Sequence, residues 1–202
     1  RAPSRQWFKP TVGLPETAPT IRDGRVYVAG GLGSGRVTAL DLDTGAVEWQ
    51  TGRVDAGSET TSAAVGDDGV FALLGRRLAR LDPDSGDLVW GFDAGEGRCP
   101  PAVADGTVFA PRRDGALAAW DAADGTRRWN ANRLRGSPSS LAVAGGTCFV
   151  VSDWSVTALD TRDGATVWNR TRADLERTLA IESPDALRPR HCTVTDDRVY
   201  LS

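Results

Sequence analysis

The chain has 202 residues, and its apolar share of 40% can form a sizeable core, which argues against an intrinsically disordered chain. The formal net charge of -3 at pH 7 gives no chain-wide attraction to nucleic acid or to an anionic membrane surface. No apolar run approaches the ~18 residues that a membrane-spanning helix needs, so we expect no membrane span. The sequence begins at Arg1, contains no methionine and shows no charged-then-apolar leader, so we expect a processed or excised piece of a longer protein.

In chain order, the predicted elements form a repeat. Residues 20–30 (TIRDGRVYVAG) predict a hairpin, and residues 38–49 (TALDLDTGAVEW) predict two further strands around a polar turn. The tryptophan that ends the second phrase recurs after 41, 39 and 39 residues, and an aspartate always precedes it by eight positions. The later hairpin phrases are at 64–74, 102–112, 142–152 and 193–202, and the later tryptophan phrases are at 79–90, 118–129 and 157–168.

Each repeat predicts four short strands. Asp105-Gly106 lies between the predicted strands 102–104 and 107–110, and Asp-Gly is the strongest short signal for a two-residue hairpin. The third and fourth strands are joined through Asp-x-x-x-Gly, in which the aspartate can bond turn amides and the glycine can take a positive φ. A four-stranded sheet with two apolar faces must stack on its neighbours, so the repeat predicts an all-β fold, a β-propeller of four-stranded antiparallel blades.

The recurring tryptophan is predicted to hold neighbouring blades together. It falls on the last strand of each unit, where a large flat ring can lie against the next blade while its N–H finds a partner there. Burial of one such ring is worth about 4–6 kcal/mol before entropy is counted. The predicted docking residues are Trp7, Trp49, Trp90, Trp129 and Trp168, with the turn residues Asp41, Asp82, Asp121, Asp160, Gly45, Gly86, Gly125 and Gly164.

The phrase A-x-D-x-x-T-G-x-x-x-W resembles the tryptophan-docking motif of PQQ-like (quinoprotein-type) β-propeller repeats, and V-x-D-G-x-V-Y-V is similar to their first hairpin. The two motifs together cover nearly all of the chain. The sequence departs from the pattern at Arg80, in place of alanine, and at Asp124 and Asp163, in place of threonine or serine. We expect these changes to touch surface turns and to leave the fold unaltered.

Four complete blades are expected, with partial strands at both ends of the chain. The complete blades would end near Trp49, Trp90, Trp129 and Trp168, while Trp7 would end an earlier blade and residues 193–202 would begin a later one. The resemblance implies a ring of commonly seven or eight blades. We therefore expect residues 1–202 to be a single PQQ-like domain that forms an incomplete ring, which missing blades or a second chain would complete.

Antiparallel strands place the turns between strands 1–2 and 3–4 on one side of a blade, here named the turn side, and the 2–3 and 4–1 loops on the other, named the loop side. The turn side collects most of the aspartates and the loop side many arginines. Either the basic loop side docks a partner, or the aspartates only form turns and the arginines are ordinary solvated residues. The candidate interaction residues on the loop side are Arg76, Arg77, Arg112, Arg113, Trp154, Arg170, Arg172 and Arg177.

One loop is longer than the others. From the docking tryptophan to the next predicted first strand takes 12 to 15 positions elsewhere, but 25 after Trp168. Leu175 and Leu179 stand at helical i, i+4 spacing before Pro184, which predicts a short helix. Long propeller loops are often recognition elements, so residues 170–192 are a candidate contact region, with a functionally neutral insertion as the alternative.

No metal or cofactor site is predicted. DLDTG and DPDSGD resemble calcium loops, but Ala123 and Arg162 take the second carboxylate position in the other two copies, whereas a turn explains all four. Cys99, Cys148 and Cys192 form no CxxC or adjacent pair, which indicates small semi-buried thiols. His191 has no second ligand near it in sequence, so metal binding there is not expected.

The sequence thus predicts a non-catalytic propeller that serves as a platform for protein interaction or ligand sensing. The expected partner is another protein or an acidic ligand, not nucleic acid. Outside the docking series, Trp120 is expected to pack on a third strand, and Trp154 to be an exposed aromatic anchor in a 2–3 loop.

The resemblance implies an extracytoplasmic or cell-surface location, because relatives of this type include the propeller lipoprotein of the outer-membrane barrel assembly machinery and sensor domains attached to kinases. The alternative function is a PQQ- and calcium-dependent quinoprotein dehydrogenase. Enzymes of that family use an adjacent cysteine pair, a calcium held by acidic and amide side chains, and an aspartate base. The three separated cysteines do not match the first of these requirements, and a fold name alone does not establish cofactor binding.

Overall fold

The computed structural model describes residues 18–30, 35–52, 61–95, 99–112, 115–131, 134, 136–178, 192–194 and 199–201. The chain divides into two compact units, residues 1–93 and 94–202, and each is described by itself. Within the described residues the structure is nearly all β, with one short helix, α1 (Arg172–Thr178). None of these residues belongs to a helix long and apolar enough to cross a membrane.

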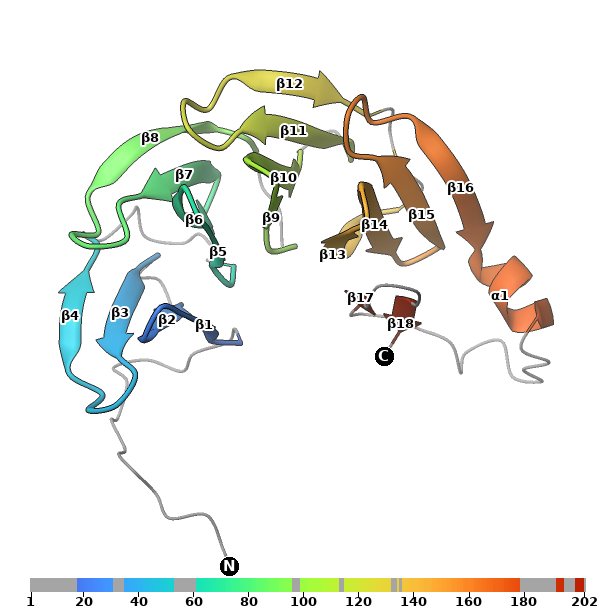
Figure 1. Ribbon diagram of the computed structural model, residues 1–202. Helices are drawn as coiled ribbons and strands as arrows, with labels where there is room; N and C mark the ends of the chain where they lie inside the picture. The colour runs from blue at the N-terminus through green and yellow to red at the C-terminus, as the bar shows by residue number, and fades with distance from the viewer. Residues whose placement is uncertain are drawn as a thin grey trace, which may run out of the picture. The chain divides into compact units, whose positions relative to one another are not determined.

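The first unit contains two four-stranded antiparallel sheets, each with its strands in chain order (Figure 1). The strands of the first sheet are β1 (Thr20–Arg22), β2 (Arg25–Ala29), β3 (Val37–Asp41) and β4 (Val47–Gln50). Those of the second are β5 (Ala64–Gly66), β6 (Gly69–Leu74), β7 (Arg77–Leu81) and β8 (Leu88–Asp93).

The second unit repeats this arrangement and adds a two-stranded hairpin. Its first sheet consists of β9 (Ala102–Ala104), β10 (Thr107–Pro111), β11 (Leu117–Asp121) and β12 (Arg127–Asn130). Its second sheet consists of β13 (Pro138–Ala144), β14 (Thr147–Ser152), β15 (Ser155–Asp160) and β16 (Thr166–Thr171), and β17 (Cys192–Val194) pairs with β18 (Val199–Leu201). The predicted fold class of four-stranded antiparallel blades is confirmed; the strand expected around Trp7 lies outside the described residues.

In three of the four sheets the turn between the first and second strands follows from an Asp-Gly or Gly-Gly pair; the β5–β6 turn has Asp67-Asp68 instead. Asp105 and Gly106 have φ values of 48° and 64°, and Asp23 and Gly24 have values of 50° and 75°. Two successive positive φ values match the right-handed twist of a hairpin, and only Gly, Asn and Asp adopt them readily. The predicted strand 102–104 therefore has the bounds of β9, and β10 runs one residue beyond its predicted end.

The Asp-x-x-x-Gly turns are closed by their own aspartates. Oδ1 of Asp41 accepts hydrogen bonds from Thr44 N at 2.7 Å and from Thr44 Oγ1 at 2.5 Å, and Oδ1 of Asp82 accepts from the amides of Asp84 and Ser85, both at 2.9 Å. Asp121 and Asp160 bond the amides of their turns in the same way. These carboxylates already have donors from the turn, which is why the four copies form turns whatever occupies the second carboxylate position.

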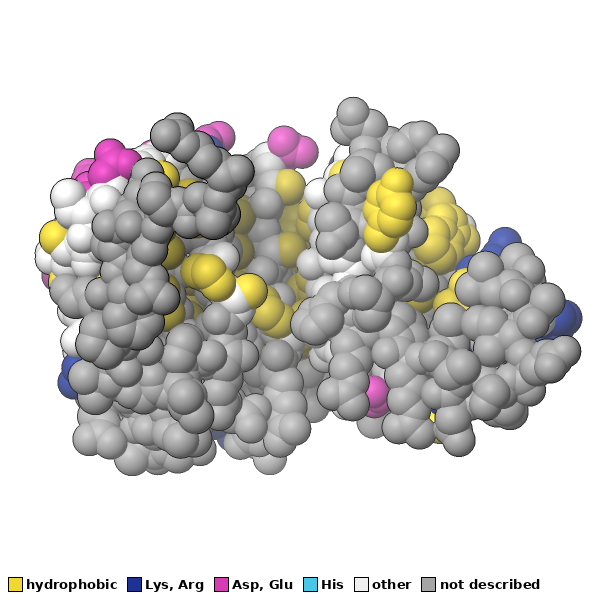
Figure 2. Space-filling view, turned by 90° about the horizontal axis from the view of Figure 1, so that it is seen from below, with side chains coloured by type: hydrophobic (Ala, Val, Ile, Leu, Met, Phe, Trp, Pro, Cys, Tyr) yellow, Lys and Arg dark blue, Asp and Glu magenta, His cyan; other side chains and the backbone are white. Residues whose placement is uncertain are grey.

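Three of these turns also bond to the hairpin turn of their own blade. Leu42 N donates to Gly24 O at 2.8 Å, Ala122 N to Gly106 O at 2.9 Å, and Thr161 N to Gly146 O at 3.0 Å. The 1–2 and 3–4 turns of these blades therefore lie at the same end, as the antiparallel order predicts. In the space-filling view, acidic side chains gather along the upper edge of the left-hand part of the molecule (Figure 2).

All four sheets carry a register shift at the same place between their third and fourth strands. The shift leaves the recurring tryptophan opposite Ala39, Ala119 and Ala158 in three blades, and opposite Arg80 in the other. Arg80 was expected in a surface turn, and this was wrong because β7 continues to Leu81. From its place in the strand, its Nε reaches the β5–β6 turn and donates to Asp68 O at 2.7 Å.

Within each blade the recurring tryptophan contacts an aromatic ring of the second strand. The ring centroids lie about 6 Å apart with tilted planes, a favoured geometry for aromatic pairs. The pairs are Tyr27–Trp49 at 5.9 Å, Phe71–Trp90 at 5.9 Å, Phe109–Trp129 at 5.8 Å and Phe149–Trp168 at 6.0 Å. Trp120 is buried in β11, which confirms that it packs on a third strand.

The turn aspartates predict loss of stability in acid. The side-chain and backbone hydrogen bonds from Arg162 hold the pKa of Asp160 at about 2, below its ordinary value of 3.8. A carboxylate with a lowered folded-state pKa stabilises the fold above its unfolded pKa, and this contribution is lost as the pH falls from about 4 through 2. Urea unfolding followed by tryptophan fluorescence should give a lower unfolding free energy at pH 3 than at pH 7. Asp160→Asn should reduce this difference between the two pH values. An unchanged pH dependence in the variant would contradict this role of Asp160.

Candidate functional site

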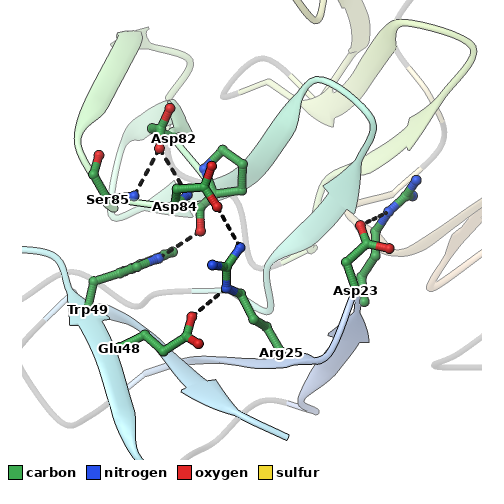
Figure 3. Close-up of polar contacts among 9 residues, drawn as sticks. Asp23, Arg25, Glu48, Trp49, Asp82, Asp84 and Ser85 are labelled. Atoms are coloured by element: carbon green, nitrogen blue, oxygen red, sulfur yellow. Dashed lines mark hydrogen bonds and ion pairs between the residues drawn. The ribbon is translucent and has the colours of Figure 1, made fainter.

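The junction between the two blades of the first unit is built around Trp49. Its Nε1 donates a hydrogen bond to Pro83 O at 2.8 Å, and its ring lies on Gly86, so that it contacts the Asp-x-x-x-Gly turn of the following blade (Figure 3). The Trp49 residue is only 7% exposed. The ring therefore buries its apolar faces and satisfies its one polar group in the same contact.

The second unit repeats this contact. Trp129, which is 8% exposed, donates from Nε1 to Thr161 O at 2.8 Å and lies on Gly164 in the turn of the next blade. A Cβ at Gly86 would lie 2.5 Å from the ring of Trp49, and one at Gly164 would lie 2.6 Å from the ring of Trp129. Glycine is thus required at these positions for the close approach of the ring as well as for the positive φ.

Trp90 and Trp168 are half-buried, and each contacts the aromatic ring of its own blade. Trp90 also stacks on Phe92, at 5.6 Å between centroids and 12° between planes. Gly45 and Gly125 have positive φ values of 67° and 76°, close to those of their counterparts. The predicted docking residue Trp7 lies outside the described residues.

The junction in the first unit also carries ion pairs that the sequence did not reveal. Arg25 contacts Glu48 of its own blade and Asp84 of the next blade, the latter at 2.8 Å, and these two carboxylates raise the pKa of its guanidinium (Figure 3). Arg22 pairs with Asp67, and Thr20 Oγ1 donates to Ala63 O at 2.6 Å. The partners that lie in different blades are 43 to 59 positions apart, so no local pattern could have identified them.

Four of the candidate interaction arginines bond within their own blades, Arg170 to the carbonyl of Asn169 beside it. Arg76 pairs with Asp93 at 3.0 Å, Arg77 donates to Gly91 O at 3.4 Å, and Arg112 donates to the side chain of Asn130 at 3.2 Å. Arg113 lies outside the described residues. These contacts tie the side chains to neighbouring strands, so the arginines of this group are not brought together into one cluster by the structure.

The last blade presents a different arrangement, in which Trp154 stands on the turn between β14 and β15. Trp154 is 60% exposed, whereas the hydroxyls of Ser152 and Ser155 beside it are buried. Ser152 Oγ accepts from Ser155 N at 3.2 Å and lies 3.1 Å from Ser155 O, which closes the turn internally. Cδ1 of the ring approaches Gly136, where a Cβ would be 2.7 Å from it.

The helix α1 begins directly after β16 and is joined to this turn. Arg172 N donates to Trp154 O at 2.9 Å. Thr171 and Asp174 cap the helix reciprocally: Asp174 N donates to Thr171 Oγ1 at 3.2 Å, while the amide and hydroxyl of Thr171 donate to Asp174 Oδ2 at 2.9 and 2.6 Å. The short helix predicted after Trp168 is confirmed for 172–178; Leu179, Pro184 and His191 lie outside the described residues.

The residues that the structure describes do not supply a metal site: none of their His, Cys, Asp and Glu side chains form a group of three or more that could hold an ion. Cys99 and Cys148 are buried free thiols and Cys192 is half-buried, and burial raises the pKa of all three. Thiols of this kind are inert packing groups, because the thiolate is the reactive form. These residues therefore do not fit the donor set that a calcium- and PQQ-dependent enzyme requires.

Comparison with known proteins places the chain in a family. The family described as outer membrane protein assembly factor BamB matches residues 5–91 and 75–201. The chain belongs to this family. Its predicted resemblance to PQQ-like propeller repeats is thereby confirmed.

Two kinds of curated relative are similar to the chain. The outer membrane protein assembly factor BamB of Burkholderia pseudomallei is 34% identical over 158 residues, which are 70% of this chain and 40% of that protein. The serine/threonine-protein kinase AfsK of Streptomyces coelicolor is 32% identical over 155 residues, which are 75% of this chain and 18% of the kinase. The chain thus spans less than half the length of these relatives.

Solved structures share the fold. BamB from Moraxella catarrhalis superimposes with a TM-score of 0.67 at 21% identity and covers 93% of this chain and 58% of that protein. Quinohemoprotein alcohol dehydrogenase from Comamonas testosteroni superimposes with a TM-score of 0.63 at 19% identity and covers 80% of this chain and 35% of the enzyme. At these identities the likeness concerns the fold alone.

The glycine requirement at the junction can be tested with a matched pair of variants. Gly86 and Gly24 have nearly equal φ values, 74° and 75°, but a Cβ at Gly24 meets nothing within 4 Å. Both alanine variants should lose about 1–2 kcal/mol because of the left-handed backbone. Gly86→Ala should lose about 1–3 kcal/mol more because it displaces Trp49; equal unfolding free energies for the two variants in urea would show that the ring does not need the glycine.

The two classes of tryptophan should differ in their effect on stability. Trp129→Ala removes a buried ring and should cost about 3–5 kcal/mol of unfolding free energy. Trp154→Ala removes an exposed ring and should change the unfolding free energy by no more than about 0.5 kcal/mol. Comparable melting temperatures of the two variants, measured by circular dichroism, would rule out the docking role of Trp129.

Proposed function

We propose that this chain is a non-catalytic propeller platform that binds another protein through the loop side of its blades. The observation that carries the proposal is Trp154, a large aromatic side chain that is 60% exposed on a turn fixed by buried hydrogen bonds. Trp49 and Trp129, by contrast, are buried at blade junctions. The similarity to outer membrane protein assembly factors supports a role in which a propeller acts on other proteins.

The chemistry of Trp154 favours a protein partner. Tryptophan and arginine are enriched among the residues that contribute most to protein–protein binding. Arg170 and Arg172 lie at the same end of the blade as Trp154. A side chain on a closed turn loses less conformational entropy on binding than one on a mobile loop. The turn side is less suited to this role, because its aspartates bond their own turn amides.

An extracytoplasmic location is part of the proposal. It is supported by the relatives whose names refer to assembly of outer membrane proteins. The similarity to AfsK kinases supports a related role, in which the propeller is attached to a signalling protein. A quinoprotein dehydrogenase is supported by the fold of its solved structures only.

Site-specific photocrosslinking in the native cell tests the platform. A photoreactive benzoylphenylalanine in place of Asp153, which is exposed beside Trp154, should give a discrete protein adduct in the full-length protein. The same probe in place of Val47, an exposed apolar residue on β4, is the matched control and should not give this adduct. Trp154→Ala should abolish the adduct at position 153. Identical products at positions 153 and 47, or none at 153, would refute the proposed binding side.

A further inference from the structure

We propose that Arg22 and Arg25 form an electrostatic latch between the two blades of the first unit, so that opening of this junction depends on ionic strength. The second unit has the same tryptophan contact, but uncharged or like-charged residues take the positions of the latch. The latch goes beyond the proposed function, because its residues belong to the turn side and not to the loop side.

Arg25 lies at the start of β2, between one carboxylate of its own blade and one of the next. It contacts Glu48 on β4, and its Nη1 lies 2.8 Å from Oδ1 of Asp84 in the β7–β8 turn (Figure 3). Asp84 follows Pro83, whose carbonyl accepts the hydrogen bond from Trp49. The ion pair therefore holds the same turn on which the ring docks.

Arg22, at the end of β1, makes a second connection between the two blades. Its Nε lies 3.2 Å from Oδ2 of Asp23 in its own blade. Its guanidinium also pairs with Asp67 in the β5–β6 turn of the next blade and donates to Val65 O at 3.4 Å. Like Arg25, this arginine is held by a carboxylate of its own blade and reaches a carboxylate of the neighbouring one.

The Arg25 pair has no equivalent in the second unit. Thr107 begins β10 as Arg25 begins β2. Arg162 follows its turn aspartate by two positions, as Asp84 does in the first unit. A threonine and an arginine cannot form an ion pair, and Arg162 instead pairs with Asp160 of its own turn, at 2.6 Å.

The Arg22 pair has no equivalent there either. Ala104 ends β9 where Arg22 ends β1. Gly145 is the first residue of the β13–β14 turn, whereas Asp67 is the first residue of the β5–β6 turn. The tryptophan of the second unit thus docks without ion pairs at these positions, although its hydrogen bond has the same length, 2.8 Å, as that of the first.

The two junctions should therefore respond differently to salt. Salt screens a buried ring and a neutral hydrogen bond little, but it weakens ion pairs at the surface, since the Debye length falls from about 10 Å at 0.1 M to about 3 Å at 1 M. The side chains of Asp67 and Asp84 are 93% and 79% exposed, so each pair contributes modestly. The latch thus shifts the opening equilibrium of a junction that the tryptophan already holds.

Hydrogen exchange of the two docked indole N–H groups tests the latch directly. It can be followed by NMR on the full-length protein with isotope-labelled tryptophan, with the two signals assigned through Trp49→Phe and Trp129→Phe. Sodium chloride is the probe, raised from about 0.05 M to about 1 M. The exchange rate of Trp49 should rise about twofold or more relative to that of Trp129, because only the first junction loses ion pairs.

Three variants separate the latch from the fold. Arg25→Gln and Asp84→Asn should each raise the relative exchange rate of Trp49 at low salt and reduce its salt dependence. The double variant should have no larger effect than either change alone, because the two side chains act on each other. The matched control is Arg127→Gln, which removes an exposed positive charge from β12 and should change the ratio by less than about 1.5-fold.

Two results would overturn the inference. A ratio of the two indole exchange rates that does not change with salt would show that the first junction has no electrostatic latch. Additive effects of Arg25→Gln and Asp84→Asn would show that these side chains act separately. Neither result bears on the proposed platform, whose test is the crosslink at position 153 on the loop side of the second unit.

Discussion

The contact between a tryptophan ring and the glycine turn of the following blade is the interaction on which each unit depends. A four-stranded sheet with two apolar faces cannot be stable alone, so its free energy of folding must come from its neighbours. Trp49 and Trp129 provide that contact in the two units, each with a hydrogen bond of 2.8 Å to a turn carbonyl. Because the acceptor is backbone, the turn must have the correct conformation before the ring can dock, and this couples the local turn to the packing of the blades.

Because of this coupling, the two ends of a blade have different roles. At the turn side, aspartates bond amides, turns bond each other and glycines receive the tryptophan rings. These groups are occupied by folding itself and leave little freedom for recognition. The loop side is not constrained in this way, and in the last blade it carries Trp154 and the capped helix α1. A scaffold whose junctions are rigid can thus hold a recognition residue in place at small entropic cost.

The repeat was sufficient to predict the blades, their strand order and the turns, because each depends on residues fewer than a dozen positions apart. Arg80 was misplaced because the pattern identified its position but not the end of β7. The aromatic partners Tyr27, Phe71, Phe109 and Phe149 recur at one position of every second strand, and this signal could have been read. The ion pair of Arg25 with Asp84 could not, because its two residues are 59 positions apart.

By itself, the sequence determined that this chain forms four-stranded blades with Asp-x-x-x-Gly turns, since hairpin geometry and the alternation of apolar residues are local properties of a strand. Only the tertiary structure decided which side chains pack against those turns. Gly86 and Gly24 have the same backbone conformation, yet only Gly86 lies under a ring. Trp129 and Trp154 have the same side chain, yet only Trp154 faces solvent. The difference arises because packing depends on what a neighbouring blade places against a residue, and no local pattern contains that information.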